Sequence, residues 1–72
     1  MQYKQLGLFI KKKREKHNIT LNSFAINNDI EPATLSRIEN LKQGIKLDVL
    51  IKISRGFNQT PANFLADFEK SK

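Results

Sequence analysis

Apolar residues recur at spacings of three and four along five short segments, and each segment is bounded by residues that cap or end helices. That spacing places apolar side chains on one face of a helix, and no stretch alternates as a half-buried strand does. The segments are residues 3–17, 20–29, 31–41, 47–57 and 60–68. With 72 residues, the chain has the length of one small domain. We therefore predict a single all-α domain of five helices over residues 1–72, frayed at residues 69–72.

Capping signals define several of the helix ends. Thr20 is a good N-cap for the second helix, because a threonine hydroxyl accepts a hydrogen bond from a first-turn amide. Glu31 can cap the third helix, and Pro32 suits its first position, where an N–H would have no helical partner. Asn18 tolerates the left-handed conformation that ends a helix. We expect Asn40 to take the same conformation at the end of the third helix.

The apolar positions define a predicted core. They are Leu6, Phe9, Ile10, Phe24, Ala25, Ile30, Leu35, Ile38, Leu47, Leu50, Ile51, Ile53, Phe57, Phe64, Leu65 and Phe68. The helix over residues 47–57 is apolar around most of its circumference, so we expect it to be central. Phe68 is the one member that could instead pair across a dimer.

Composition excludes several kinds of site. The chain has no cysteine and a single histidine, His17, so we expect no disulfide, metal centre or cofactor. It has neither a glycine-rich phosphate loop nor a nucleophile elbow, so we expect no enzyme. No apolar run approaches the roughly 20 residues of a membrane span, and the apolar start precedes the basic cluster, the reverse of a secretory signal. We expect a cytoplasmic protein with no membrane partner.

Charge points to an acidic partner. The net charge is +6 and the pI about 9.9, and such a basic domain is a candidate for binding nucleic acid. Residues 1–20 carry six basic side chains and one acidic, whereas residues 21–45 carry two basic and three acidic. The consecutive Lys11, Lys12 and Lys13 point in different directions on a helix. They form either a solvated face or a general electrostatic attractor.

A small polar stripe on the third helix is the most informative feature. Ala33, Ser36, Arg37 and Asn40 share one face, opposite the apolar Leu35. A helix that enters the DNA major groove needs small or hydrogen-bonding side chains on its outer face, and a preceding helix joined by a short turn crosses the backbone. The segment over residues 20–41 therefore predicts a helix-turn-helix that binds double-stranded DNA.

From Leu6 to Leu65 the chain resembles the lambda-repressor/Cro-like helix-turn-helix domains. The matching residues are Leu6-Gly7, Ile10, Arg14, Ile19-Thr20, Phe24-Ala25, Thr34 to Glu39, Leu50, Lys52-Ile53, Phe57 and Phe64-Leu65. The resemblance implies a compact five-helix domain with a central helix-turn-helix and a sequence-specific transcriptional regulator. It also implies a structural ion pair between Arg14 and Glu39, which would tie the first helix to the recognition helix.

The resemblance also assigns DNA contacts. It places base reading on Pro32, Ala33 and Arg37, with Ser36 nearby. Arginine can donate to both O6 and N7 of guanine, and an alanine methyl can touch the methyl of thymine. It places phosphate contacts on Thr20, Thr34, Asn40, Lys42, Gln43 and Lys46. Such contacts position a protein on DNA without reading sequence.

Three functional readings follow. The first is a sequence-specific regulator that binds a two-fold operator as a homodimer, because a single small domain makes few base contacts. The two half-sites would lie about 34 Å apart. The second is an antitoxin-like protein-interaction module on the same scaffold, favoured by Leu21 at a position where relatives contact phosphate and by Glu31 and Pro32. The third is sequence-independent binding to nucleic acid, driven by the basic first segment.

Overall fold

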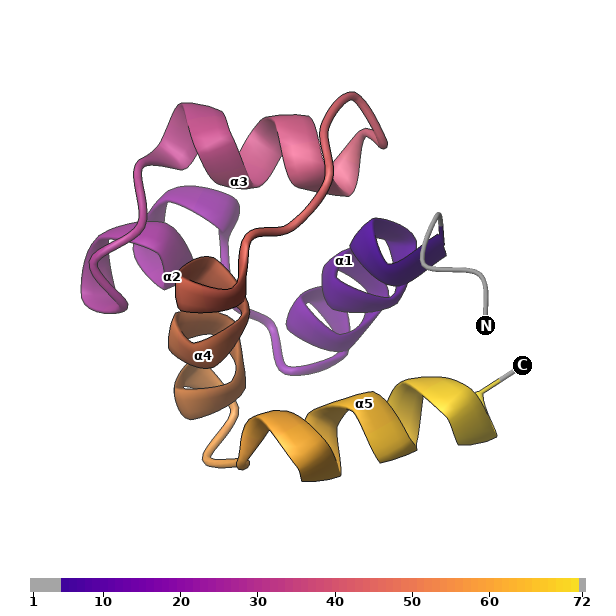
Figure 1. Ribbon diagram of the computed structural model, residues 1–72. Helices are drawn as coiled ribbons and strands as arrows, with labels where there is room; N and C mark the ends of the chain where they lie inside the picture. The colour runs from indigo at the N-terminus through magenta and orange to yellow at the C-terminus, as the bar shows by residue number, and fades with distance from the viewer. Residues whose placement is uncertain (1–4, 72) are drawn as a thin grey trace.

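The computed structural model describes residues 5–71, and all the regular secondary structure in this range is helical. The five helices are α1 (Leu6–Lys16), α2 (Leu21–Asn27), α3 (Pro32–Glu39), α4 (Leu47–Gly56) and α5 (Pro61–Lys70) (Figure 1). The prediction of an all-α fold of five helices is confirmed. The start of the first predicted helix, residues 3–4, lies outside the described residues, as does Lys72, and α5 remains helical through Lys70.

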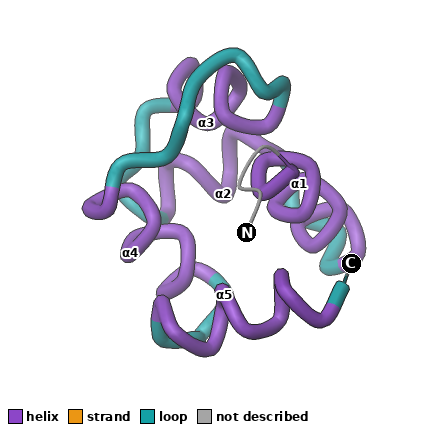
Figure 2. Tube along the Cα trace, turned by 45° about the vertical axis from the view of Figure 1, so that its right-hand side comes forward, coloured by secondary structure: helices purple, strands orange, loops and turns teal. Residues whose placement is uncertain are grey.

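Helix α3 is held by the two helices that precede it. It packs against both α1 and α2, whereas α4 packs against α5. Figure 1 shows α3 and α2 at one end of the molecule and α5 crossing the other, and the turned view of Figure 2 keeps this order. The outer side of α3 is therefore directed away from the body of the domain.

The core lies between these helices. Ile10, Leu35, Ile53 and Phe64 are fully buried, and each comes from a different helix. The prediction that α4 is apolar on nearly all sides because it is central was wrong for Leu47, which is 70% exposed. Leu47 is the first residue of α4, whereas the buried residues of this helix, Ile53 and Ser54, lie in its second half.

Phe68 belongs to this core. It is 2% exposed, and its ring meets that of Phe9 edge-on at 5.5 Å. Phe9 meets Phe64 in the same way at 5.4 Å, which is the arrangement that aromatic quadrupoles favour. The expectation that Phe68 could pair across a dimer was therefore wrong, because its ring is covered by its own chain.

Four helices end with a residue in the left-handed conformation: Asn18, Asp29, Leu41 and Asn58 have φ angles of 56° to 60°. After α1, for example, the amide of Ile19 donates to the carbonyl of Arg14 and that of Asn18 to Glu15. This pair of bonds satisfies carbonyls that the end of a helix leaves free. The prediction for Asn18 is confirmed.

The expectation for Asn40 was wrong. Its φ angle is −91°, and Leu41 takes the left-handed conformation instead. The end of α3 requires this, because Leu41 and Lys42 donate to the carbonyls of Ile38 and Arg37 at 3.1 and 2.8 Å. A leucine in this conformation costs about 1–2 kcal/mol of backbone energy, which glycine or asparagine would largely avoid.

The helix N-termini differ in whether the side chain at the cap position makes a hydrogen bond. The hydroxyl of Thr20 accepts from the Ser23 amide at 3.2 Å, and that of Thr60 accepts from Asn63 at 3.1 Å. Glu31 occupies the cap position of α3 but makes no capping hydrogen bond, so that expectation was wrong. Glutamate is one methylene longer than aspartate, and it is not among the preferred N-cap residues, whose short side chains reach back to the first turn.

Within residues 5–71, none of the helices has the length and apolar character needed to cross a bilayer.

Candidate nucleic-acid interface

The two faces of α3 differ sharply. Leu35, Ile38 and Glu39 are buried against the domain. On the other side Ala33, Arg37 and Asn40 are exposed, while Pro32 and Ser36 are half-buried. The structure therefore brings the predicted base-reading residues together on one side of a single helix, with the short turn after α2 leading into it.

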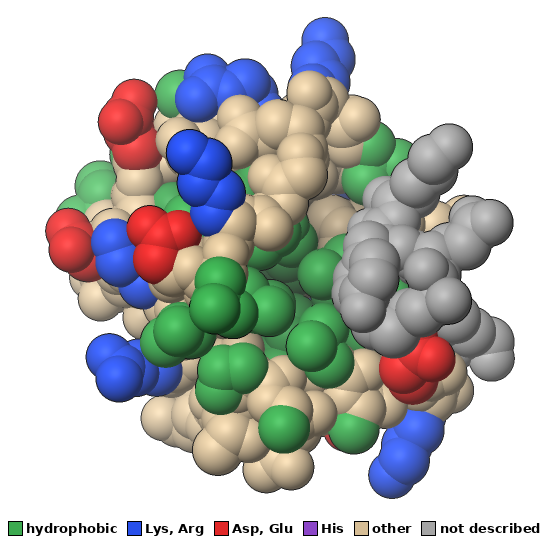
Figure 3. Space-filling view, in the orientation of Figure 1, with side chains coloured by type: hydrophobic (Ala, Val, Ile, Leu, Met, Phe, Trp, Pro, Cys, Tyr) green, Lys and Arg blue, Asp and Glu red, His purple; other side chains and the backbone are tan. Residues whose placement is uncertain are grey.

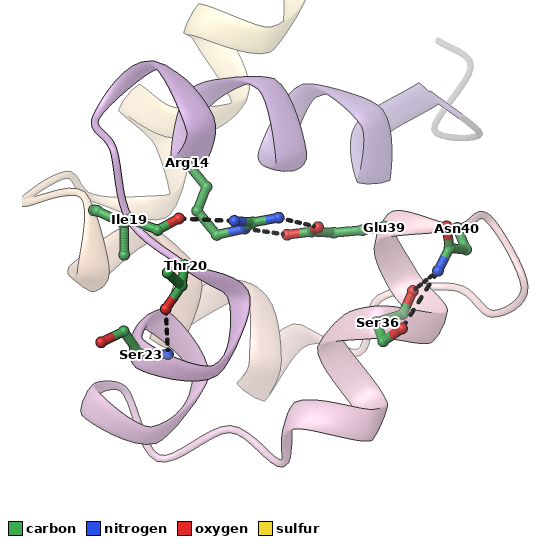
Figure 4. Close-up of polar contacts among 7 residues, drawn as sticks. All are labelled: Arg14, Ile19, Thr20, Ser23, Ser36, Glu39 and Asn40. Atoms are coloured by element: carbon green, nitrogen blue, oxygen red, sulfur yellow. Dashed lines mark hydrogen bonds and ion pairs between the residues drawn. The ribbon is translucent and has the colours of Figure 1, made fainter.

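A buried ion pair joins the inner face of α3 to α1 (Figure 4). Arg14 Nε and Nη2 donate to the two carboxylate oxygens of Glu39 at 2.9 and 2.8 Å, and its Nη1 donates to the Ile19 carbonyl at 2.7 Å. Arg14 is 7% exposed and Glu39 is 3% exposed. One guanidinium thus fixes α1, the turn after it and α3 together, as the family resemblance implied.

The pKa of Arg14 follows from these contacts. The hydrogen bonds to Glu39 raise the pKa of the guanidinium above its ordinary value, and the negative charge of Glu39 acts in the same direction. Burial opposes both effects, because it disfavours the charged form. The guanidinium is therefore ionised throughout the working range of the protein.

A backbone contact reinforces the same junction. A Cβ atom at Gly7 would lie 2.0 Å from the carbonyl oxygen of Ile38, so α1 and α3 approach as closely as only glycine allows. Together with the ion pair, this contact sets the position of α3 from its buried side.

The residues assigned to phosphate contacts lie around this face, but they differ in exposure and in the hydrogen bonds that they already make. Lys42, Gln43 and Lys46 are exposed in the loop after α3. Thr20 is exposed at the start of α2, and its oxygen is engaged by the Ser23 amide. Leu21 is half-buried against the core, which explains an apolar residue at that position.

Several of the predicted contact residues bind one another, which the sequence did not reveal. Arg37 Nε donates to Gln43 Oε1 at 2.6 Å, and Arg37 Nη2 lies 3.4 Å from the hydroxyl of Thr34. Asn40 donates through Nδ2 to the carbonyl and hydroxyl of Ser36 at 2.9 and 3.3 Å. The only feature of the sequence that could have indicated the bond between Arg37 and Gln43 is a side-chain amide six residues after the arginine, beyond the end of the helix.

The basic run of α1 is dispersed, as its helical spacing predicts. Lys12 is exposed, whereas Lys11 and Lys13 are half-buried. The ammonium of Lys13 lies 3.8 Å from an Asp67 oxygen and 5.5 Å from the centre of the Phe57 ring. Lys13 therefore helps to hold α1 against the C-terminal half of the domain.

An apolar groove adjoins the end of α3. It has a volume of about 760 Å³, and its lining includes Leu6, Ile38, Leu41, Ile45 and Leu65. Figure 3 shows hydrophobic side chains around this hollow, with Lys and Arg side chains above and to the left of it and Asp and Glu side chains at the left edge of the same face. The apolar depression thus lies on a face that carries charges of both signs.

Comparison with known proteins agrees with this arrangement. Residues 10–65 match the helix-turn-helix family. A relative from a Mycoplasma species, named control protein C.MunI, is 37% identical over 60 residues, which span 83% of this chain and 81% of the relative. A search of solved structures found no significant match. The chain therefore belongs to the Cro/CI-type helix-turn-helix family of DNA-binding transcription regulators.

Proposed function

We propose that the protein reads a specific DNA sequence by placing the outer face of α3 in the major groove. The observation that carries this proposal is the division of α3 into a buried side, locked by Arg14–Glu39 and Gly7, and an accessible side with small and polar residues. A recognition helix needs both, because base contacts are specific only if the helix is held in one orientation.

Arg37 is the principal base reader in this proposal. It is exposed, and a guanidinium can donate two hydrogen bonds to guanine, a contact that discriminates by about 1–3 kcal/mol. The exposed methyl of Ala33 suits contact with a thymine methyl, and Pro32 and Ser36 flank it. Of the remaining assignments, Thr20, Thr34, Asn40, Lys42 and Lys46 are proposed as phosphate contacts, whereas Gln43 accepts a hydrogen bond from Arg37. Only Lys42 and Lys46 of this set neutralise phosphate charge, and two neutralised phosphates per domain would give a log–log salt slope of about −1.8.

A homodimer is the second part of the proposal. One eight-residue helix reaches only a few base pairs, and a two-fold pair doubles them at half-sites about 34 Å apart. Leu41, which lines the groove, is 46% exposed and also bears the cost of a left-handed backbone. Leu47, two residues after the lining residue Ile45, is 70% exposed. The groove adjoins the end of α3, so a second copy seated there would lie next to the recognition helix.

In-vitro selection tests the proposal directly. The full chain would be incubated with random duplexes at about 150 mM salt, and the retained DNA sequenced. Enrichment of an inverted repeat would support a dimeric reader, whereas retention without enrichment would favour sequence-independent binding. Sedimentation of the wild type and of Leu47→Lys would report the dimer separately, and Asn63→Lys, an exposed position on α5, is the matched charge control.

A protein-interaction module is the alternative function. The exposed Glu31 at the start of α3 favours it, because its carboxylate makes no capping hydrogen bond and would repel a DNA phosphate. This reading predicts no retention on DNA-cellulose at low salt and co-purification of a protein partner. Glu31→Gln distinguishes the two, since it should strengthen DNA binding if α3 enters DNA and leave it absent otherwise.

A further inference from the structure

The contact between Arg37 and Gln43 links the recognition helix to the loop that follows it. Arg37 Nε donates to Gln43 Oε1 at 2.6 Å, a short hydrogen bond for two exposed side chains. The loop is anchored to the same residue through its backbone, because the Lys42 amide donates to the Arg37 carbonyl at 2.8 Å. Gln43 is therefore held at a fixed place relative to Arg37.

We propose that Gln43 is a positioning residue that holds the Arg37 guanidinium in the orientation for base reading, rather than a phosphate contact. This inference rests on the proposed function. An exposed arginine loses much rotamer freedom when it binds, and a partner that restricts the side chain beforehand reduces this loss. Such restriction acts on discrimination between bases, because only the correctly placed arginine reaches two acceptors of guanine.

The hydrogen-bond donors of Arg37 fit this role. A guanidinium has five N–H groups. The edge formed by Nε and Nη2 faces Gln43 at 2.6 Å and, more weakly, the Thr34 hydroxyl at 3.4 Å. Among residues 5–71, Nη1 has no hydrogen-bond partner, and the contact to Thr34 is the one that Nη2 makes, which leaves one of its two N–H groups available. Two parallel N–H groups thus remain for O6 and N7 of a guanine.

Two substitutions at Gln43 separate positioning from phosphate binding. Gln43→Ala removes both the Oε1 acceptor and the Nε2 donor. Gln43→Glu keeps an acceptor for Arg37 Nε but replaces the amide donor by a charged oxygen that repels phosphate. A positioning role requires Oε1, whereas a phosphate contact requires Nε2.

The experiment uses the full chain and the operator obtained by selection. The readout is the ratio of Kd values between a duplex with one substituted base pair and the intact operator, taken at the pair where Arg37→Ala abolishes preference. We expect a wild-type ratio of about 5- to 150-fold. Gln43→Ala should reduce this ratio toward the Arg37→Ala value. The double variant Arg37→Ala/Gln43→Ala should show the same ratio as Arg37→Ala alone. Gln43→Glu should keep the ratio while binding both duplexes more weakly.

The controls distinguish failure of this inference from failure of the proposed function. Lys42→Ala, the neighbouring exposed position, should weaken both duplexes equally. If Gln43→Ala keeps the wild-type ratio while Arg37→Ala loses it, positioning by Gln43 is wrong and base reading by Arg37 stands. If Arg37→Ala changes the ratio at no base pair, the proposed base reading fails first. Without DNA, the Arg37 Nε–H should exchange with solvent faster in Gln43→Ala than in the wild type, and equal rates would overturn the proposal.

Discussion

Replacing Arg14 or Glu39 singly should destabilise the domain far more than replacing both. Arg14→Met leaves the Glu39 carboxylate, 3% exposed, without its charged partner, and removes the bond to the Ile19 carbonyl. Glu39→Leu leaves a buried guanidinium with only that carbonyl. Breaking one side of a buried pair costs about 3–5 kcal/mol. A chain of 72 residues has a total stability of about 4–11 kcal/mol, so each single variant loses about a quarter or more of the unfolding free energy.

The double variant removes both buried charges at once. Replacing a buried ion pair with apolar residues of similar volume is neutral or stabilising in other proteins. The orphaned carbonyl of Ile19 costs about 1–3 kcal/mol. We therefore expect Arg14→Met/Glu39→Leu to be more stable than either single variant, with a coupling energy of about 3 kcal/mol or more.

Urea unfolding at 25 °C, followed by circular dichroism, measures these differences. Glu39→Gln is a milder single variant that retains one acceptor for Arg14, which keeps the comparison possible if Glu39→Leu does not fold. A coupling energy below about 0.5 kcal/mol would refute the reasoning, because it would mean that the two side chains stabilise the fold independently.

The pH dependence of the same comparison follows from the pKa of Arg14. The pKa is raised in the folded state, so its contribution to stability is complete below the unfolded pKa and is lost only as pH rises through the folded one. Both values lie above the alkaline range of ordinary measurements. The difference in unfolding free energy between the wild type and Arg14→Met/Glu39→Leu, which removes both charges, should therefore be constant from pH 7 to 10.

Three further predictions concern the interface and its support. Arg37→Ala should cost about 1–3 kcal/mol of binding to the selected operator but little on random DNA, measured by fluorescence anisotropy; equal losses on both would contradict base reading. Gly7→Ala should lower the unfolding free energy by about 2 kcal/mol or more, because its Cβ would meet the Ile38 carbonyl, whereas Gly44→Ala, which faces open space, should change it by less than about 1 kcal/mol. At Leu41, the glycine variant should be about 1 kcal/mol more stable than the alanine variant, the reverse of the order inside a helix; alanine being the more stable would argue against the left-handed turn.

The fold was predictable because it rests on local signals that the sequence displays. Thr20, Asn18 and Pro32 mark helix ends through chemistry confined to a few neighbouring residues. The predictions that were wrong concern residues whose conformation depends on contacts beyond their immediate neighbours. Leu41 is left-handed because the amides of two successive residues must reach carbonyls of α3, and no propensity of leucine announces that.

The candidate site was predictable in part. The periodicity of α3 located its outer face, since residues at spacings of three and four must lie on one side. The bond between Arg37 and Gln43 crosses a helix end and depends on the path of the loop, which sequence spacing does not define. The apolar groove likewise needs residues from α1, α4 and α5 to meet, so it became visible only in three dimensions.

The way α3 is fastened also bears on how such a regulator evolves. Its attachment depends on Glu39, on the backbone at Ile38 and on buried Leu35, none of which lies on the outer face. Ala33 and Arg37 are exposed and contribute little to folding stability. Changes at these positions would be tolerated by the fold, so drift there can generate new operator preferences without an intermediate that fails to fold. After a duplication, the two copies could diverge to separate regulatory targets through few substitutions.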